Sequence, residues 1–435
     1  MHLTAILWFE IGVAVLMGVG ILWTKPEYSL FVYAFALGFP DVALPLGTAI
    51  NIRIDDALVL VFFVRSLLWV PAPFSLRQRK IFAWQALFLA LCLVSAAVGA
   101  ARGAPPEAYE TAKMAGCAAI LLVLPRLIQS ERRLRFLIAG LMCGGCALVI
   151  QVAERLGTNP ANAFANFQEL KNAATFSTWN PNTIGQAAML LAFSAGLGGI
   201  LFPRTRRNRF LWASLATGFA VVPLLVFVRG TSLSIAAGFI LFLCMVRRWR
   251  WALLFAAACL CVVLYLHSVD RQLVEEATDV NLETGEGFSH RFDRWDMALR
   301  AIRTNALLGQ GFGQEWNYLR LVGSEGRAHN AYLTVWLELG LGGLVLFVAA
   351  ISQFIRAGLF LYRSSRFQPQ GALILALTVA LALDSLGLPT LYWEKLPTIA
   401  LCIVVVVVGL CERSDSAVAE REIRAFARSP FTQLS

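Results

Sequence analysis

The chain has 435 residues, of which 58% are hydrophobic and 15% are charged, and its formal net charge is +10. With a mean hydropathy of +0.67, it is too apolar for a water-soluble fold. The positive charge does not indicate a nucleic-acid partner, because the basic residues form short separate runs instead of covering one face.

Successive apolar runs predict membrane-spanning helices. Many are close to the length of about 20 residues that a helix needs to cross roughly 30 Å of hydrocarbon; examples are residues 81–100, 134–153 and 371–383. Backbone polar groups need partners inside lipid, and the alternating strands of a barrel are missing, so these runs should be helices. We therefore expect an all-α polytopic membrane protein with about twelve or thirteen transmembrane helices.

The N-terminal region allows two topologies. Segments near 4–23, 28–48 and 55–72 could form three spans, which would place the N-terminus outside. If Pro40 and Pro45 make the second segment partly re-entrant, the N-terminus lies inside. The first 23 residues are apolar but carry no basic n-region and no clear cleavage site, so we expect no cleavable signal peptide.

Basic residues concentrate in the connections between the later helices. The runs are 76–80, 131–135, 203–209, 247–250 and 356–366. By the positive-inside rule these connections face the cytoplasm. The segments that then fall outside are 101–112, 155–182, 229–231, 268–329 and 384–396.

Nine cysteines lie in or beside the apolar runs. Cys143 and Cys146 have the spacing of a redox or metal pair, but in a spanning helix small-residue packing is the commoner reason for Cys-Gly-Gly-Cys. We expect no disulfide, no metal and no cofactor.

Two short polar features precede the longest loop. The Asn180-Pro181-Asn182 turn could cap the helix that begins near Thr183, and contact of Asn180 and Asn182 with a glycan is the alternative. Arg229 lies in an outer turn of a few residues between two spans. A charge at the edge of the apolar core usually has a partner or a task, although snorkelling to lipid headgroups would also explain it.

The long outer loop, residues 268–329, contains a predicted amphipathic helix. Its apolar residues recur at three- and four-residue steps: Phe288, Phe292, Trp295, Leu299 and Ile302. Arg291 and Arg294 are three residues apart and share a face beside this stripe. Gly309, Gly311 and Gly313 should end the helix in a flexible or tightly turned segment. A helix lying on the bilayer with its arginines on lipid phosphates is the simpler interpretation.

The same loop leads directly into Arg327, His329 and Asn330, and then into a strongly apolar helix. Helix N-termini favour anions, because their N–H groups are free and carry partial positive charge. Arginines, a histidine and a helix start at the outer membrane surface would therefore suit a phosphate-bearing ligand. A histidine that only caps the helix is the structural alternative.

These residues resemble the O-antigen ligase and O-antigen polymerase family of bacterial envelope enzymes. The family motif is a histidine, a polar residue, nine residues, glycine, two residues and a small residue, which His329, Asn330, Gly340 and Gly343 match. The lead-in RFDRWDMALRAIRTNALLGQGFG and the segments VRGTSLS and WNPNTIG are similar to further family segments. Together they occur in one order over roughly 175–345.

The resemblance implies a metal-independent, GT-C-like membrane glycosyltransferase in the bacterial inner membrane. Its donor would be a glycan on undecaprenyl diphosphate, bound at the periplasmic face among membrane lipids. Its acceptor would be lipid A–core for a ligase or a lipid-linked glycan for a polymerase. One branch of the family transfers glycans to protein hydroxyls, but its members usually carry a further C-terminal region.

The resemblance and the physical chemistry together suggest roles for single residues. His329 would be the general base that takes the proton of the acceptor hydroxyl. Arg229 and Arg291 would bind the departing diphosphate, because the planar guanidinium pairs with two phosphate oxygens and stays charged. The remaining candidates would bind substrate: Arg294, Arg327, Asn330, Asn180 and Asn182.

The expected organisation has four parts: a transmembrane bundle over 1–267, a periplasmic loop with the catalytic residues over 268–329, C-terminal transmembrane helices over 330–411 and a cytoplasmic tail over 412–435. The His-Asn form of the motif favours a ligase. A polymerase stays open, since both share fold, donor and chemistry. A transporter or flippase is less favoured, because no internal repeat is visible and the notable charges cluster at the outer face, with Glu10, Arg65 and Glu338 as the exceptions.

Overall fold

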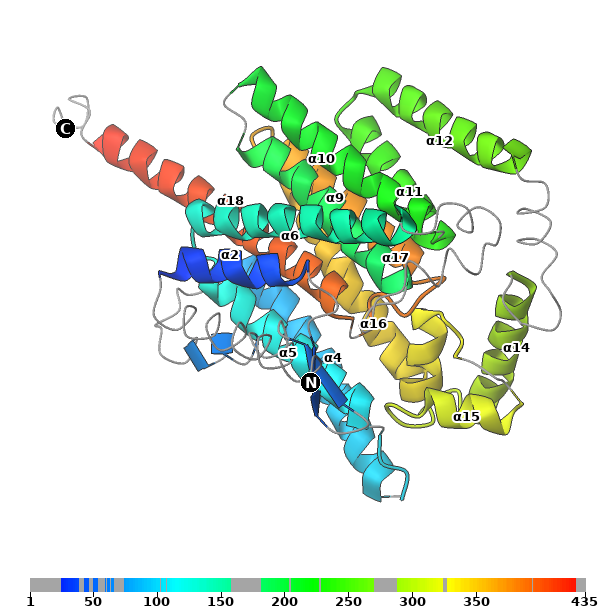
Figure 1. Ribbon diagram of the computed structural model, residues 1–435. Helices are drawn as coiled ribbons and strands as arrows, with labels where there is room; N and C mark the ends of the chain where they lie inside the picture. The colour runs from blue at the N-terminus through cyan, green and yellow to red at the C-terminus, as the bar shows by residue number, and fades with distance from the viewer. Residues whose placement is uncertain are drawn as a thin grey trace, which may run out of the picture.

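The computed structural model describes residues 25–38, 43–46, 50–53, 59, 61–62, 64–65, 74–101, 103–106, 108–157, 181–202, 205–226, 228–269, 288–323, 327–392 and 394–427. These residues are almost all in helices, and a two-stranded antiparallel hairpin of β1 (Ala43–Leu46) and β2 (Ile50–Arg53) is the exception among them. The expected all-α membrane fold is confirmed (Figure 1).

Five helices in the described part of the chain are long and apolar enough to cross a membrane. They are α4 (Leu76–Ala101), α6 (Glu131–Gly157), α9 (Pro181–Leu201), α16 (Ala331–Arg363) and α18 (Lys395–Ala427). Further helices complete the bundle: α5 (Ala108–Leu127), α10 (Arg206–Leu225), α11 (Arg229–Met245), α12 (Trp249–Val269) and α17 (Gln368–Asp384). The apolar runs 81–100, 134–153 and 371–383 thus lie in α4, α6 and α17, as predicted.

The N-terminal part differs from one of the two predicted topologies. Helix α2 (Pro26–Ala36) has 11 residues, which at about 1.5 Å per residue is too short to cross the bilayer. The hairpin follows it, so residues 28–48 do not form a single spanning helix. The segment 4–23 and most of 55–72 lie outside the described residues, and the orientation of the N-terminus stays open.

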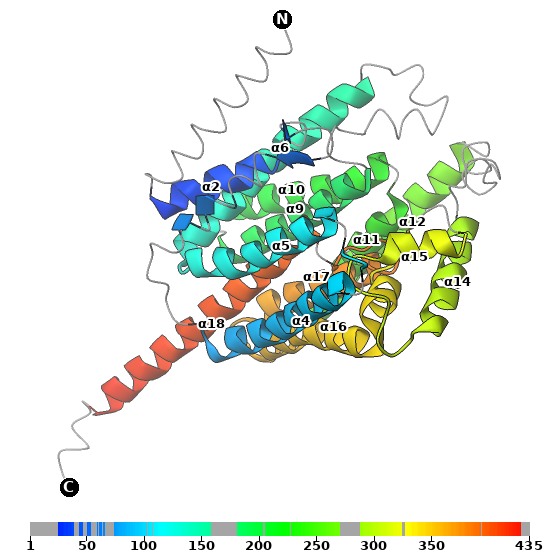
Figure 2. The ribbon, with the colours of Figure 1, turned by 90° about the horizontal axis from the view of Figure 1, so that it is seen from below.

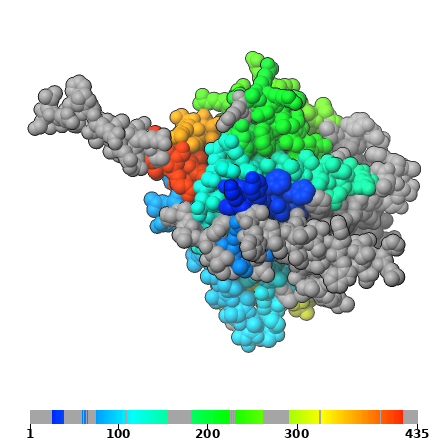
Figure 3. All heavy atoms as spheres, turned by 60° about the vertical axis from the view of Figure 1, so that its left-hand side comes forward, coloured from blue at the N-terminus to red at the C-terminus, as the bar shows by residue number. Residues whose placement is uncertain are grey.

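Burial separates the central helices from the peripheral ones. In α9 and α18, 78% of the most apolar window is buried inside the protein, against 17% in α4. Glycines let α2 approach α6, because a Cβ at Gly140 or Gly144 would collide with the Phe31 or Phe35 carbonyl oxygen. Figure 3 shows α2, in deep blue, against α6. The Cys-Gly-Gly-Cys segment therefore serves helix packing, as predicted, and Cys143 and Cys146 are free.

The bundle has two polar ends. We call the end formed by α14 (Phe288–Thr304), α15 (Glu315–Leu321) and residues 384–394 the loop end, and the end formed by residues 76–80, 356–366 and 412–415 the tail end. In Figures 1 and 2 the two ends lie at opposite sides of the molecule, with α14 and α15 far from the protruding end of α18. The predicted outer segments that the structure describes gather at the loop end, and the basic runs 76–80 and 356–366 gather at the tail end.

Helix α18 runs without a break from Lys395 to Ala427. It therefore passes residue 412, where we expected a cytoplasmic tail to begin. Arg77 pairs with Glu412 at 3.3 Å and Arg366 with Asp415 at 3.6 Å, so this part of α18 is tied to the tail end.

Candidate active site

Helix α14 is amphipathic, as predicted, but its buried face is rotated from the predicted stripe. Ala298, Ala301 and Ile302 are at most 2% exposed and pack against α15 and α16. Phe292 is 57% exposed and Leu299 is 37% exposed. Phe292 and Leu299 belong to the apolar stripe in the sequence but are exposed. The small side chains of Ala298 and Ala301 allow α14 to lie close to α15 and α16. The amphipathic helix is confirmed, and the buried face includes only part of the predicted apolar stripe.

The glycine-rich segment after α14 is tightly turned and lies against α16. Gly309, Gly311 and Gly313 all have positive φ, at 74°, 113° and 73°. A Cβ on Gly309 would lie 2.4 Å from the Glu338 carbonyl oxygen. Only glycine fits such a left-handed conformation at this distance without strain.

Helix α16 is broken at Gly340, where the backbone is non-helical with φ 69°. The segment after α14 satisfies the backbone groups that the break leaves free. The N–H groups of Gln310 and Gly311 donate to the carbonyls of Leu337 and Glu338 at 2.7 and 2.9 Å, and the Leu341 N–H donates to the Ala306 carbonyl at 2.9 Å. The break at Gly340 thus allows the segment after α14 to form backbone hydrogen bonds with α16.

His329 and Asn330 stand at the start of α16. The Asn330 side chain accepts hydrogen bonds from the N–H groups of Tyr332 and Leu333 at 3.0 and 3.1 Å, so Asn330 caps the helix. His329 precedes the cap, is partly exposed and has a left-handed backbone with φ 50°. The N-cap of α16 is therefore Asn330.

The turn after α17 joins the separate segments of the loop end. The buried Asp384 carboxylate accepts hydrogen bonds from Thr231 at 2.7 Å and Thr390 at 2.5 Å. The next residue, Ser385, accepts a bond from the Ala331 N–H at 2.9 Å. The start of α11 and the start of α16 therefore meet at residues 384–385.

Arg291 reaches the same turn from α14. A Cβ on Gly387 would lie 3.0 Å from its Nη1 atom. Burial and the neighbouring Arg294 lower the pKa of Arg291, and the negative charge of Asp384 opposes this shift. Arg294 is also partly buried. The guanidinium of Arg291 is thus a partly desolvated cation beside a carboxylate.

The structure brings three of the predicted positions together around residues 384–387. Arg229 begins α11, two residues before Thr231, which donates to Asp384. Arg291 and the His329–Asn330 start of α16 approach the same turn.

The asparagine segment lies close by. Asn182 is the second residue of α9, and Gln186, one turn later, donates to Thr390 at 3.3 Å. The start of α9 therefore lies next to the turn that holds Asp384. Asn180 lies outside the described residues.

The family comparison matches this part of the chain. Residues 216–348 match the family model described as O-antigen ligase. This match supports the O-antigen ligase/polymerase family that the sequence motifs predicted. The matched segment contains Arg229, Arg291 and His329, whereas the Asp384 turn lies outside it. No curated protein matches the chain.

The O-antigen ligase family that this segment matches implies a glycosyltransferase-type membrane enzyme that uses lipid-linked glycans. In the residues that the structure describes, no three His, Cys, Asp or Glu side chains are grouped as a metal site requires. The polar groups of the loop end are instead arginines, a histidine, threonines and buried carboxylates.

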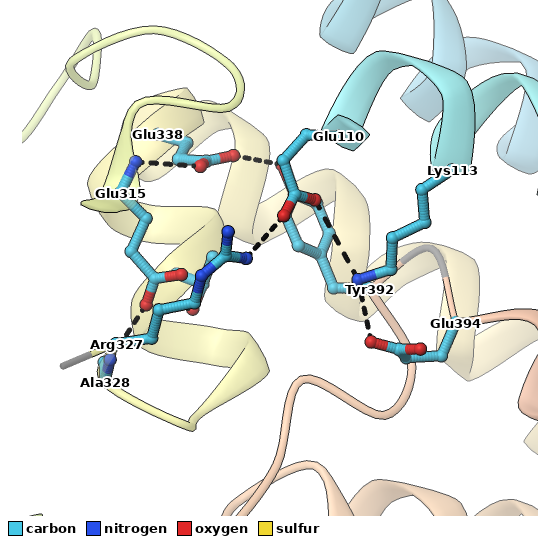
Figure 4. A network of polar contacts seen from close by, with 9 residues as sticks. Glu110, Lys113, Glu315, Arg327, Ala328, Glu338, Tyr392 and Glu394 are labelled. Carbon is cyan, nitrogen blue, oxygen red and sulfur yellow. Dashed lines mark hydrogen bonds and ion pairs between the residues drawn. The ribbon is translucent and has the colours of Figure 1, made fainter. Parts of the chain in front are cut away.

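A network of carboxylates around Arg327 and Ala328 was not predicted from the sequence (Figure 4). Glu315 accepts hydrogen bonds from the Ala328 N–H at 2.9 Å and from Thr334 at 3.0 Å. Its own N–H donates to Glu338 at 3.1 Å, and Glu338 accepts the Tyr392 hydroxyl at 2.6 Å. Burial raises the pKa of Glu315, and the bond from the Ala328 N–H opposes this shift.

In the sequence, one signal pointed to this network. Glu338 lies in the middle of an apolar stretch, where a carboxylate needs a partner, but its partners come from positions 23 and 54 residues away. Asp384 likewise ends an apolar helix and finds Thr231 across 153 residues. Such long-range pairs follow from the packing of the helices and not from local spacing.

Proposed function

We propose that the protein transfers a glycan from undecaprenyl diphosphate to a saccharide acceptor at the periplasmic face of the inner membrane. The observation that carries this proposal is the convergence of the α11 start, Arg291 and the His329 segment on the turn at residues 384–387. A departing diphosphate needs cations, and an attacking hydroxyl needs a base; both kinds of group belong to this one region.

In the proposed reaction His329 takes the proton of the acceptor hydroxyl as the oxygen attacks the anomeric carbon. A histidine side chain has an ordinary pKa of about 6.5, so a neutral ring is available at neutral pH. The bond from the anomeric carbon to the diphosphate oxygen breaks, and the electron pair leaves with the diphosphate. General-base help of this kind contributes about 10²–10⁴-fold in rate.

Arg291 and Arg229 would stabilise the charge that grows on the diphosphate. Preorganised donors at developing charge commonly contribute about 2.7–4 kcal/mol each. The oxygens of Asp384 are occupied by two threonines, and Asp384 affects Arg291 through its charge without a direct ion pair, which leaves the Arg291 guanidinium able to contact a diphosphate. Arg294, Asn182 and Asn180 stay predicted substrate contacts, and Asn330 stays one in addition to its cap. No metal or cofactor is part of the proposal.

The acceptor that we propose is lipid A–core, which makes the protein an O-antigen ligase. The motif form, with asparagine after the histidine, favours this choice. A polymerase of lipid-linked repeat units is the second candidate, since it would use the same donor and the same chemistry.

A deletion strain separates the two candidates. Loss of a ligase leaves long polymer on the carrier lipid and none on lipid A–core, whereas loss of a polymerase leaves single repeats on lipid A–core. Complementation with the wild-type chain restores the normal glycan in either case. If deletion leaves both the carrier-linked and the acceptor-linked glycans unchanged, the proposed function is wrong.

A further inference from the structure

The three residues that precede the α16 cap, Arg327, Ala328 and His329, are held from two sides. On one side, Arg327 pairs with Glu110 of α5 (Figure 4). Glu110 is only 10% exposed at its side chain and lies 3.9 Å from Lys113, which pairs with Glu394 at 2.7 Å. The ion-pair chain thus connects residue 327 to α5 and to the end of the 384–394 turn.

On the other side, Glu315 holds Ala328. Its Oε1 atom accepts both the Ala328 N–H and the Thr334 hydroxyl, so one carboxylate joins the residue before His329 to the first turn of α16. The Trp295 indole N–H donates to the Ala328 carbonyl at 2.9 Å. Both backbone groups of Ala328 are therefore held by buried or partly buried side chains.

This support matters because His329 has a left-handed backbone, which is unfavourable for a residue with a side chain. A strained residue keeps its conformation only where the surroundings fix it. We propose that Glu110, acting through Arg327, and Glu315, acting through Ala328, are positioning residues that fix the His329 ring at the mouth of α16. Arg327 then orients the base and does not bind the donor phosphate. This inference rests on the proposed function of His329.

Two physical features favour positioning over phosphate binding for Arg327. Its guanidinium is already engaged by a mostly buried carboxylate, so a diphosphate at this arginine would also face the negative charge of Glu110. In addition, the Arg327 ion-pair chain reaches the 384–394 turn at Glu394, at the opposite end of the turn from Gly387, which Arg291 approaches. The positive charge of Arg327 is therefore balanced by Glu110 within the protein.

We call the ion pair of Glu110 with Arg327 the first clamp and the hydrogen bonds of Glu315 to Ala328 and Thr334 the second clamp. A double-mutant cycle tests the first clamp. The full-length protein is reconstituted in proteoliposomes with an undecaprenyl-diphosphate oligosaccharide as donor and lipid A–core as acceptor. We expect Arg327→Ala and Glu110→Ala each to lower kcat by about 10- to 100-fold, because a small misplacement of a catalytic group costs this much, with the donor KM unchanged. The double variant should be no worse than the more severe single variant.

A phosphate-binding Arg327 gives a different pattern. Arg327→Ala would raise the donor KM, Glu110→Ala would leave it unchanged, and the two effects would multiply in the double variant. That result would overturn the inference. Arg327→Lys sharpens the test, because a lysine can still pair with Glu110 but cannot contact two phosphate oxygens; we expect it to keep most of the wild-type kcat.

The second clamp is tested by Glu315→Gln and Glu315→Ala. The glutamine keeps an oxygen acceptor for Ala328 and Thr334 and should stay close to wild type, whereas alanine removes it and should lower kcat. Equal activity of the two variants would contradict a positioning role. Should Glu315→Ala fail to fold, the Glu110 cycle and the next measurement still decide.

Hydrogen–deuterium exchange gives a readout that does not depend on transfer. In Arg327→Ala, Glu110→Ala and Glu315→Ala, we expect faster exchange in residues 327–333 than in the wild type, with residues 395–411 unchanged. Unchanged exchange in 327–333 would contradict the clamps even if transfer were lost. If the wild type transfers no glycan while exchange changes as expected, the proposed function fails and the clamps stand.

Discussion

The loop end and the tail end of the bundle both carry carboxylates, but the burial of these carboxylates differs. At the loop end, Glu315, Glu338 and Asp384 are each at most 4% exposed, and each is held by hydrogen bonds from other segments. At the tail end, the side chains of Arg366 and Asp415 are 49% and 45% exposed. Exposed pairs contribute little, whereas a buried carboxylate that loses its partners is strongly destabilising.

The difference shows where the fold requires fixed side-chain positions. Buried polar groups are costly, and a membrane protein keeps them where they have a task. The tail end needs only to hold the helices at the water boundary. The loop end places charged groups and strained backbone close together, as the proposed catalytic site requires.

Substitution of His329 should show the largest effect. His329→Asn removes the base, but asparagine tolerates the left-handed backbone, so the fold should be kept. We expect glycan transfer to fall by about 10²–10⁴-fold with an unchanged melting midpoint. Full transfer by this variant at equal expression would show that His329 is not the base.

Arg291 should show the next largest effect. Arg291→Lys keeps the charge but loses the planar pair of donors, and we expect transfer to fall by about 10²-fold or more. Arg300 on the same helix is the matched control, because it pairs with Asp296 at 2.6 Å and is 70% exposed. Arg300→Lys should transfer at the wild-type rate. Equal rates for the two variants would mean that the loop end has no special cation at position 291.

The break in α16 gives a stability comparison. Gly340 has φ 69°, and a Cβ there would lie 2.2 Å from the Leu307 carbonyl oxygen, whereas a Cβ at Gly342 would meet nothing within 4 Å. We expect Gly340→Ala to cost about 1–3 kcal/mol or more through backbone strain, seen as a lower melting midpoint in detergent. Gly342→Ala should match or exceed the wild-type midpoint, since alanine favours the helix. Equal midpoints would argue against a required break.

The tail end should show the smallest effect. Glu412→Gln removes the pair with Arg77, and we expect a loss of at most about 1 kcal/mol, as for partly exposed ion pairs, with transfer unchanged. A large loss of transfer in this variant would remove the functional distinction between the two ends.

Much of the fold could be predicted from the sequence, because apolar runs of spanning length and basic connections follow directly from the bilayer. The amphipathic helix and the three glycines were found for the same local reason. Which face of α14 packs inside the protein could not be predicted, because small residues such as Ala298 and Ala301 form that face and carry little hydrophobic signal. Residues 28–48 were open to two interpretations because Pro40 and Pro45 interrupt an otherwise apolar segment.

The candidate site could be predicted only in part. His329, Arg291 and Arg229 stand out because charged or ionisable groups are rare at the edge of an apolar chain. Asp384 and Glu315 were missed, because no local sequence pattern marks either residue. Each carboxylate binds a threonine of another helix, Thr231 and Thr334, and such contacts depend on how the helices pack. The matched family segment ends before Asp384, so the resemblance did not supply it either.

The position of the donor diphosphate tests the central claim most directly. A cryo-electron microscopy structure of the full chain with a non-hydrolysable undecaprenyl phosphonophosphate glycan would show it. We predict diphosphate density at the loop end, between the start of α11 and the Arg291 guanidinium near Gly387, with the glycan facing His329. Density at the tail end beside Arg77, or density at the loop end with no contact to Arg291, would contradict the account.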